Sequence, residues 1–146
     1  MSPPRLPLTR ALLGALAEGT GRPCGLGVLP RGVDGGPAAF PYAILDSLDG
    51  EFAGPEFADW HADAAWTYQV TSVGERADQV QWLADRVRAV VVDRNFEGWC
   101  WEIPVAGMAV MDRELVADAG GDPVDGSQGD IVTYVQRFAI TVSPAA

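Results

Sequence analysis

Residues 65–92, AWTYQVTSVGERADQVQWLADRVRAVVV, decide the fold class because they join an alternating strand to an amphipathic helix through one short turn. Apolar and polar side chains alternate from Trp66 to Thr71, which is the period of a strand with one buried face. After Gly74, apolar residues recur every three or four positions: Val80, Leu83, Ala84, Val87, Val90 and Val91. That spacing predicts a helix that buries a valine-rich stripe.

The sequence also suggests where this helix begins and ends. Ser72-Val73-Gly74-Glu75 matches the S/T-x-x-E capping box, in which the hydroxyl and the carboxylate bind backbone N–H groups of the first turn. Asn95 and Gly98 are residue types that commonly end helices. We therefore expect the helix to begin just after Ser72 and to end near residues 93–95.

Segments on both sides of this unit complete the predicted fold. A short amphipathic helix is expected near the N-terminus, because four leucines share one helical face: Leu8, Leu12, Leu13 and Leu16. Extended segments are expected over residues 24–30, 41–48, 99–105, 107–118 and 133–142, and loops over 31–40, 49–63 and 119–130. We therefore expect one α+β domain spanning residues 1–146. It would have a mostly antiparallel or mixed sheet of about five strands with two helices packed against it, in the order α-β-β-β-α-β-β.

The charge balance excludes some classes of function. The chain has 20 acidic and 10 basic residues and a net charge of -10. Sequence-specific binding to nucleic acid needs a basic face to neutralise phosphates, so it is not expected here. No apolar run approaches the ~20 residues that span a bilayer, so no membrane partner is expected. The apolar N-terminal segment superficially resembles a signal peptide, but its leucine spacing favours the first helix.

The residue types that carry catalysis or bind metals do not form a recognisable site. His61 is the only histidine and lies between Asp59 and Asp63, which is too few ligands for a metal. The two cysteines, Cys24 and Cys100, share no metal-ligand spacing, and no G-x-S-x-G nucleophile turn is present. The acidic run GDPVDGSQGD lacks the spacing of a calcium loop. We therefore expect neither an enzyme nor a bound cofactor or metal.

Several residues instead suggest contact surfaces. Trp82 lies roughly 140° from the centre of the apolar helix stripe, one turn before Arg86, which is placed to stack on its ring. The ring is either covered by a loop of its own chain or anchors a subunit contact. The predicted loop 49–63 adds three aromatic residues in an acidic setting: Phe52, Phe57 and Trp60.

Three blocks of the chain resemble the tail terminator proteins of long-tailed phages that infect actinobacteria. They are PYAILDSLDG (41–50), WTYQVTSVGERADQVQWLADRVR (66–88) and QRFAITVSP (136–144), and YQVTSVG with QWLADRVR is the most specific part. The likeness covers residues 41–93 and 131–144. It implies a virion structural protein, assembled in the host cytoplasm, that forms a ring at the head–tail interface. A hexamer would be expected, with the tail tube protein and a head–tail connector as partners.

Within such a ring, exposure and composition suggest roles for individual residues. Trp82 with Arg86 would form one contact patch, and Phe52, Phe57 and Trp60 the other. An acidic loop at 118–130 would face the lumen or the tube end, where its charge repels passing DNA: Asp118, Asp122, Asp125 and Asp130. Two alternatives remain open: another neck protein, and a small-molecule-binding or enzymatic α+β domain with a pocket lined by Trp99, Trp101 and Tyr134.

Overall fold

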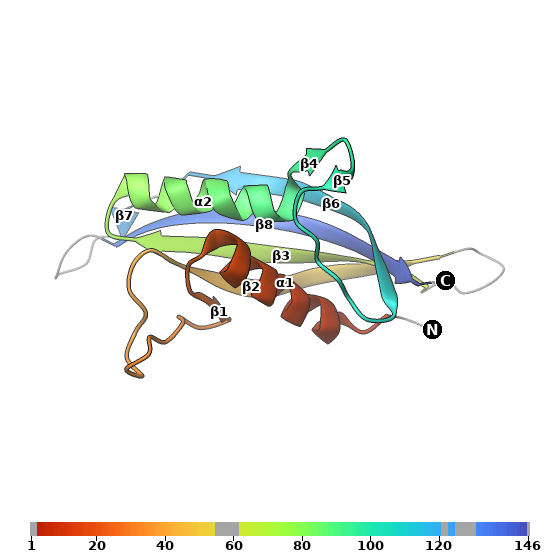
Figure 1. The fold of residues 1–146 in the computed structure, drawn as a ribbon, viewed down its shortest axis with the longest axis horizontal. Helices are drawn as coiled ribbons and strands as arrows, with labels where there is room; N and C mark the ends of the chain where they lie inside the picture. The colour runs from red at the N-terminus through yellow and green to blue at the C-terminus, as the bar shows by residue number, and fades with distance from the viewer. Residues whose placement is uncertain (1–2, 55–61, 121–122, 125–130, 146) are drawn as a thin grey trace.

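The computed structural model describes residues 3–54, 62–120, 123–124 and 131–145. Two helices pack on one face of a six-stranded sheet, and a separate two-stranded hairpin projects beside it (Figure 1). The predicted α+β class and element order are confirmed. The helices are α1 (Arg5–Thr20) and α2 (Ala77–Val92). The sheet contains β1 (Cys24–Leu26), β2 (Tyr42–Ala53), β3 (Asp63–Gly74), β6 (Met108–Ala119), β7 (Pro123–Val124) and β8 (Ile131–Pro144), and the hairpin β4 (Arg94–Asn95) and β5 (Gly98–Trp99).

The sheet has the strand order β1-β2-β3-β8-β6, with β7 paired to β8. β3 is central and pairs antiparallel with both β2 and β8, and β6 pairs antiparallel with β8. Among the described strands, the short β1 alone runs parallel to its neighbour, over Cys24 to Leu26. The sheet is therefore mixed and mostly antiparallel, with β1 and β6 at its two edges.

The core lies between the helices and one face of the sheet. Alternate residues of β3 are buried, as the period-two pattern predicts, and the apolar stripe of α2 is buried against β3 and β8. α1 packs beside α2 and closes the same face. The largest fully buried side chains include Trp66, Tyr68, Phe138, Leu8, Leu12, Leu16, Leu45 and Leu83. The hydroxyls of Thr9 and Tyr68, 2.8 Å apart, are hydrogen-bonded inside this core and tie α1 to the central strand.

The capping-box prediction is wrong. β3 continues to Gly74, because β8 pairs with it as far as Val132, so Ser72 lies inside a strand. Its hydroxyl is buried and has no hydrogen-bond partner among the described residues. The helix begins at Ala77. Two of its first-turn side chains bind backbone: Gln79 Oε1 accepts a 2.8 Å hydrogen bond from the Glu75 N–H, and Asp78 Oδ1 accepts a 3.0 Å bond from the Gln79 N–H.

Two strand boundaries also differ from prediction, each because a neighbouring strand holds the chain extended. β2 runs on to Ala53, through residues predicted as loop, because β3 pairs with it past an irregularity between Ser47 and Gly50. Gly50 is required there, since a Cβ would meet the Trp66 ring and the Arg5 guanidinium. β6 reaches Ala119, so Asp118 lies in a strand.

Other predicted segments are shorter or differently paired. The strand expected over 24–30 is limited to Cys24–Leu26. Of the extended segment expected over 99–105, only Trp99 belongs to a strand, and that strand is part of the hairpin. α2 ends at Val92 near the predicted point, but Asn95 and Gly98 do not cap it. They face each other across the hairpin turn instead.

The packing of α1 generates a stability prediction. Leu12→Ala should lower the free energy of unfolding by ~2–5 kcal/mol, because it leaves a cavity beneath a fully buried side chain. Leu6→Ala is the matched control on the same helix: Leu6 is half exposed, so the change should stay within ~0.5 kcal/mol. Urea unfolding measures both. Equal losses from the two variants would show that α1 does not bury the face described above.

The start of α2 generates a second prediction. Ser72→Ala should leave the free energy of unfolding unchanged or raise it by up to ~1–3 kcal/mol, because it removes a buried hydroxyl that has no partner among the described residues. Gln79→Ala should lower it by ~0.5–1.5 kcal/mol through loss of its bond to Glu75. Urea unfolding of both variants decides between the two helix starts. If Ser72→Ala lowered the free energy of unfolding by ~1 kcal/mol, the result would support the capping-box prediction.

Candidate functional site

Trp82 lies on the outward face of α2, where helix geometry predicts it. Its side chain is 44% exposed, and the Arg86 guanidinium carbon lies 4.8 Å from the ring centroid. The predicted stacking of Arg86 on Trp82 is therefore confirmed. The two residues stand one turn apart, so the pair is formed by the helix alone and presents a flat aromatic surface to solvent.

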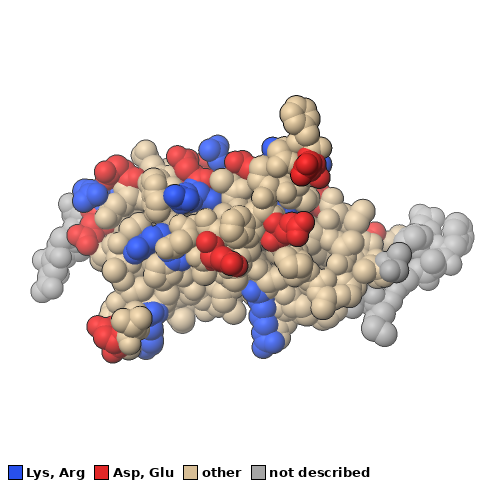
Figure 2. All heavy atoms as spheres, viewed as in Figure 1, with Lys and Arg blue, Asp and Glu red and all other residues tan. Residues whose placement is uncertain are grey.

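The surface around Trp82 carries charges of both signs. Arg76 bonds to Asp78 at 3.0 Å, and Arg88 lies 3.7 Å from Asp85. The hydrogen bond from Arg76 is the main reason why the pKa of Asp78 lies below its ordinary value. Figure 2 shows acidic and basic residues interspersed along this side of the molecule. An aromatic centre with a mixed charged rim is typical of protein–protein contacts.

The second predicted patch is described only in part. Phe52 lies near the end of β2, is 46% exposed, and meets the buried Trp66 edge to face, with 6.4 Å between the ring centroids. It stands on a strand and not in a loop, and part of its ring is committed to its own chain. Phe57 and Trp60 lie outside the described residues.

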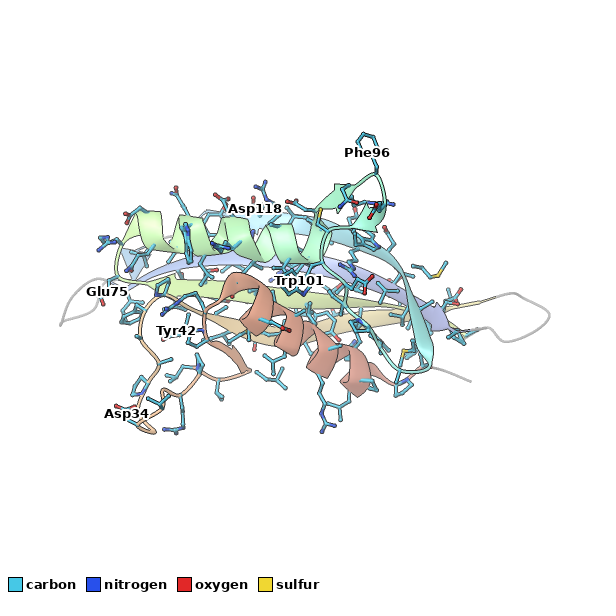
Figure 3. All side chains as sticks on the ribbon, in the orientation of Figure 1. Asp34, Tyr42, Glu75, Phe96, Trp101 and Asp118 are labelled. Carbon is cyan, nitrogen blue, oxygen red and sulfur yellow. The ribbon has the colours of Figure 1, made fainter. Side chains whose placement is uncertain are left out.

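The predicted acidic loop is likewise only partly described. Asp118, labelled in Figure 3, lies on β6 opposite Gln136 of β8. Its carboxylate accepts a hydrogen bond from the Tyr134 hydroxyl. That bond to a carboxylate stabilises the protonated phenol and raises the pKa of Tyr134, with smaller contributions from desolvation and the charge of Asp118. The other three acids of the prediction lie outside the described residues: Asp122, Asp125 and Asp130.

The most exposed aromatic ring of the described residues was not predicted. Phe96 stands at the tip of the β4–β5 hairpin with a relative exposure of 110%, and it points away from the body of the molecule (Figure 3). The turn is held by the Asn95 side-chain oxygen, which accepts a 2.8 Å bond from the Glu97 N–H. Cys100 N–H donates to Asp93 across the base of the hairpin. Asn95 and Gly98, two turn-forming residues around Phe96-Glu97, were the sequence signal for it.

The hairpin is anchored on β6 through Trp99. The guanidinium carbons of Arg94 and Arg113 lie 4.6 and 4.8 Å from the Trp99 ring centroid. Arg113 is buried, donates to the Trp101 carbonyl at 2.7 Å and reaches the Val91 carbonyl at 3.4 Å. Burial lowers the pKa of Arg113 to about 10, against the opposing charge of Glu102, so it stays cationic at neutral pH. One buried cation thus joins the hairpin, β6 and the end of α2.

The described residues do not assemble the aromatic pocket of the ligand-binding alternative. Trp99 lines a groove of about 350 Å³ with Glu102 and Arg113, and Trp101 lines a different one of about 180 Å³. Tyr134 lines neither of these two.

The described residues also hold few groups for metal or thiol chemistry. They contain no cluster of three His, Cys, Asp or Glu placed to hold a metal ion, and His61 is not among them. Burial raises the pKa of the Cys24 thiol to about 12. None of the helices in these residues has the length and apolar character needed to cross a membrane.

Comparison of the chain with models of protein families and with curated proteins finds no match. No matching family therefore supports the resemblance of residues 41–93 and 131–144. The geometry of the exposed surfaces is the remaining guide to function.

The Asp118–Tyr134 bond generates a pH-dependent prediction. Asp118→Asn should lower the pKa of Tyr134 towards the ordinary tyrosine value of ~10, because the carboxylate no longer favours the protonated phenol. Because the pKa of Tyr134 is higher in the folded chain than in the unfolded chain, the bond stabilises the fold at pH values below the unfolded-state pKa. This stabilisation is lost as the pH rises through the folded-state pKa. NMR titration of the tyrosine rings measures the shift. Asp112→Asn, on the opposite face of β6, should leave Tyr134 unchanged.

Proposed function

We propose that this chain is a phage tail terminator, a virion structural protein that assembles as a ring on the head-proximal end of the tail tube. The ring, expected to be a hexamer, stops polymerisation of the tail tube protein and offers a surface to the head–tail connector. The observation that carries the proposal is the resemblance of residues 41–50, 66–88 and 136–144 to that class.

The position of those blocks in the fold supports the proposal. They fall on β2, β3, α2 and β8. The three strands are adjacent in the sheet, and α2 packs over β3 and β8. The resembling residues therefore form one connected unit that contains the centre of the core, and are not scattered over unrelated loops.

The exposed aromatic residues also suit assembly. A ring closes through heterologous contacts, in which each subunit uses two different patches. Trp82 with Arg86 lies on the outer face of α2, and Phe52 lies on β2, so these two features belong to different elements. Their separation is what a head-to-tail contact requires.

The acidic character fits a ring through which DNA passes. A net charge of -10 gives the surface an overall repulsion for phosphates. We place the acidic segment 118–130 towards the lumen or the tube end. Asp118 is the described member of that segment, and its bond to Tyr134 holds it beside α2, where Asp85 and Arg88 also act on the phenol.

Growth of tail tubes in the presence of the chain tests the proposal. The tail tube protein of the same phage should form shorter tubes when the chain is added well below equimolar amounts, because one ring blocks one growing end. Electron microscopy measures tube length, and native mass spectrometry measures the ring. Unchanged tube length together with binding to a head-side connector would favour the neck-protein alternative. A strict monomer that ignores both partners would exclude both virion functions.

The same assay tests Trp82. Trp82→Ala should weaken ring formation at least tenfold, as expected for loss of an aromatic anchor worth ~1.4 kcal/mol or more. Gln81→Ala is the matched control, since Gln81 is a neighbouring exposed residue of α2. Both variants should unfold like wild type in urea. Equal ring yields from the two variants would show that Trp82 does not contribute to the interface.

A further inference from the structure

The β4–β5 hairpin presents Phe96 as a rigid knob. The ring packs against no described part of its own subunit, since its relative exposure is 110%. The base of the hairpin is nevertheless firmly held, by Arg94 and Arg113 on Trp99 and by the Asn95–Glu97 bond of the turn. A large apolar side chain on an ordered support loses little conformational entropy on binding, which favours a role in contact with another surface.

A groove of about 450 Å³ lies on the far side of the molecule, between the start of α1 and the β1–β2 edge. Its apolar lining is provided by Leu6, Leu26 and Leu45, of which Leu6 and Leu26 are 51% and 42% exposed. The groove exists because β1 pairs with β2 only as far as Leu45. Gly27 then turns the chain away with a φ of 70°.

The knob and the groove are on opposite edges of the sheet. The hairpin is anchored to β6, and the groove borders β1 and β2, which stand at the other end of the strand order. Figure 1 shows β4 and β5 on one long side of the molecule and β1 on the other. The knob therefore cannot reach the groove of its own subunit.

The charges beside the two features are complementary. Arg94 and Glu97 flank Phe96 on the hairpin, and the groove contains Arg5 and Asp46. Each side thus offers one cation and one anion. Because Arg94 stacks on Trp99, and Arg5 donates to Ser47 and Leu48 within the subunit, these charges supplement the apolar contact and do not carry it.

We propose that Phe96 of one copy inserts into the groove lined by Leu6, Leu26 and Leu45 of the next copy. The partner is a second copy of this chain, and the contact is head to tail. Closure of successive contacts into a ring rests on the proposed function, whereas the contact between two copies does not. One aromatic knob gives a weak pair, and closure of several contacts supplies the avidity.

Cysteine cross-linking in trans tests the contact. In a Cys24→Ala, Cys100→Ser background, a Glu97→Cys copy, which keeps the Phe96 ring, mixed with a Leu26→Cys copy should form a disulfide-linked dimer under mild oxidation. The rate should exceed at least tenfold that of Glu97→Cys mixed with Val33→Cys, because Val33 is fully exposed but lies outside the groove. Equal rates would overturn the proposal.

Complementation of two blocked variants provides an independent arm. Phe96→Asp removes the knob, and Leu26→Arg fills the groove with a charge, so neither variant should self-associate alone. Their mixture should give a one-to-one dimer, since each retains what the other lacks. Val33→Asp should associate like wild type. Circular dichroism checks that all variants fold, which both exposed positions favour. Because one contact lacks the avidity of several, the dimer is measured by chemical cross-linking at high concentration, and a mixture that gives no more dimer than either variant alone would overturn the proposal.

Tube growth separates this contact from the proposed function. If the Phe96→Asp variant still shortens tail tubes as wild type does, the proposed contact of Phe96 is wrong and the proposed terminator function is unaffected. Selective Glu97–Leu26 cross-linking in a chain that never shortens tubes would support the contact and contradict the terminator function. Cross-linking of Glu97→Cys to added tube protein in place of a second copy would contradict the contact between copies.

Discussion

The antiparallel pairing of β3 with β8 is the constraint on which the rest of the structure depends. Its register runs unbroken from Ala64 opposite Val142 to Gly74 opposite Val132. One continuous face therefore carries Trp66 and Phe138, and both helices bury their apolar sides against it. A slip of one residue would turn all of these side chains to the other face of the sheet. The pairing thus also decides which residues of α2 point away from the core, Trp82 among them.

Features that depend on local periodicity were predictable from the sequence. The buried face of β3 follows from simple alternation, and the stripe of α2 follows from the spacing of its valines. The outward position of Trp82 and its contact with Arg86 need only helix geometry, so they were predicted before any packing was known. In each case the determining residues lie within one or two turns of each other, and tertiary structure adds burial without changing the conformation.

Features that depend on distant partners were missed, and the physical reason is the same each time. Ser72 belongs to a strand because β8 continues beside it, and residues 49–53 are extended because β3 pairs with them across Gly50. The hairpin has a turn signal in Asn95 and Gly98, but those residue types also end helices, and the hairpin is held in part by a distant residue, Arg113. Its buried guanidinium holds Trp99 from a strand that the local sequence does not reveal.

The anchoring by Arg113 also bears on assembly. Arg113 bonds to the Trp101 carbonyl, contacts the Trp99 ring and reaches the carbonyl of Val91 at the end of α2, so the direction of Phe96 is fixed relative to the core. The groove on the other edge is fixed equally, because β1 is paired to β2. In a head-to-tail contact, the rotation between successive copies follows from the angle between the two patches. A rigid fold with patches on opposite sheet edges therefore sets that rotation within each subunit, and whether the rotation closes decides between a ring and an open filament.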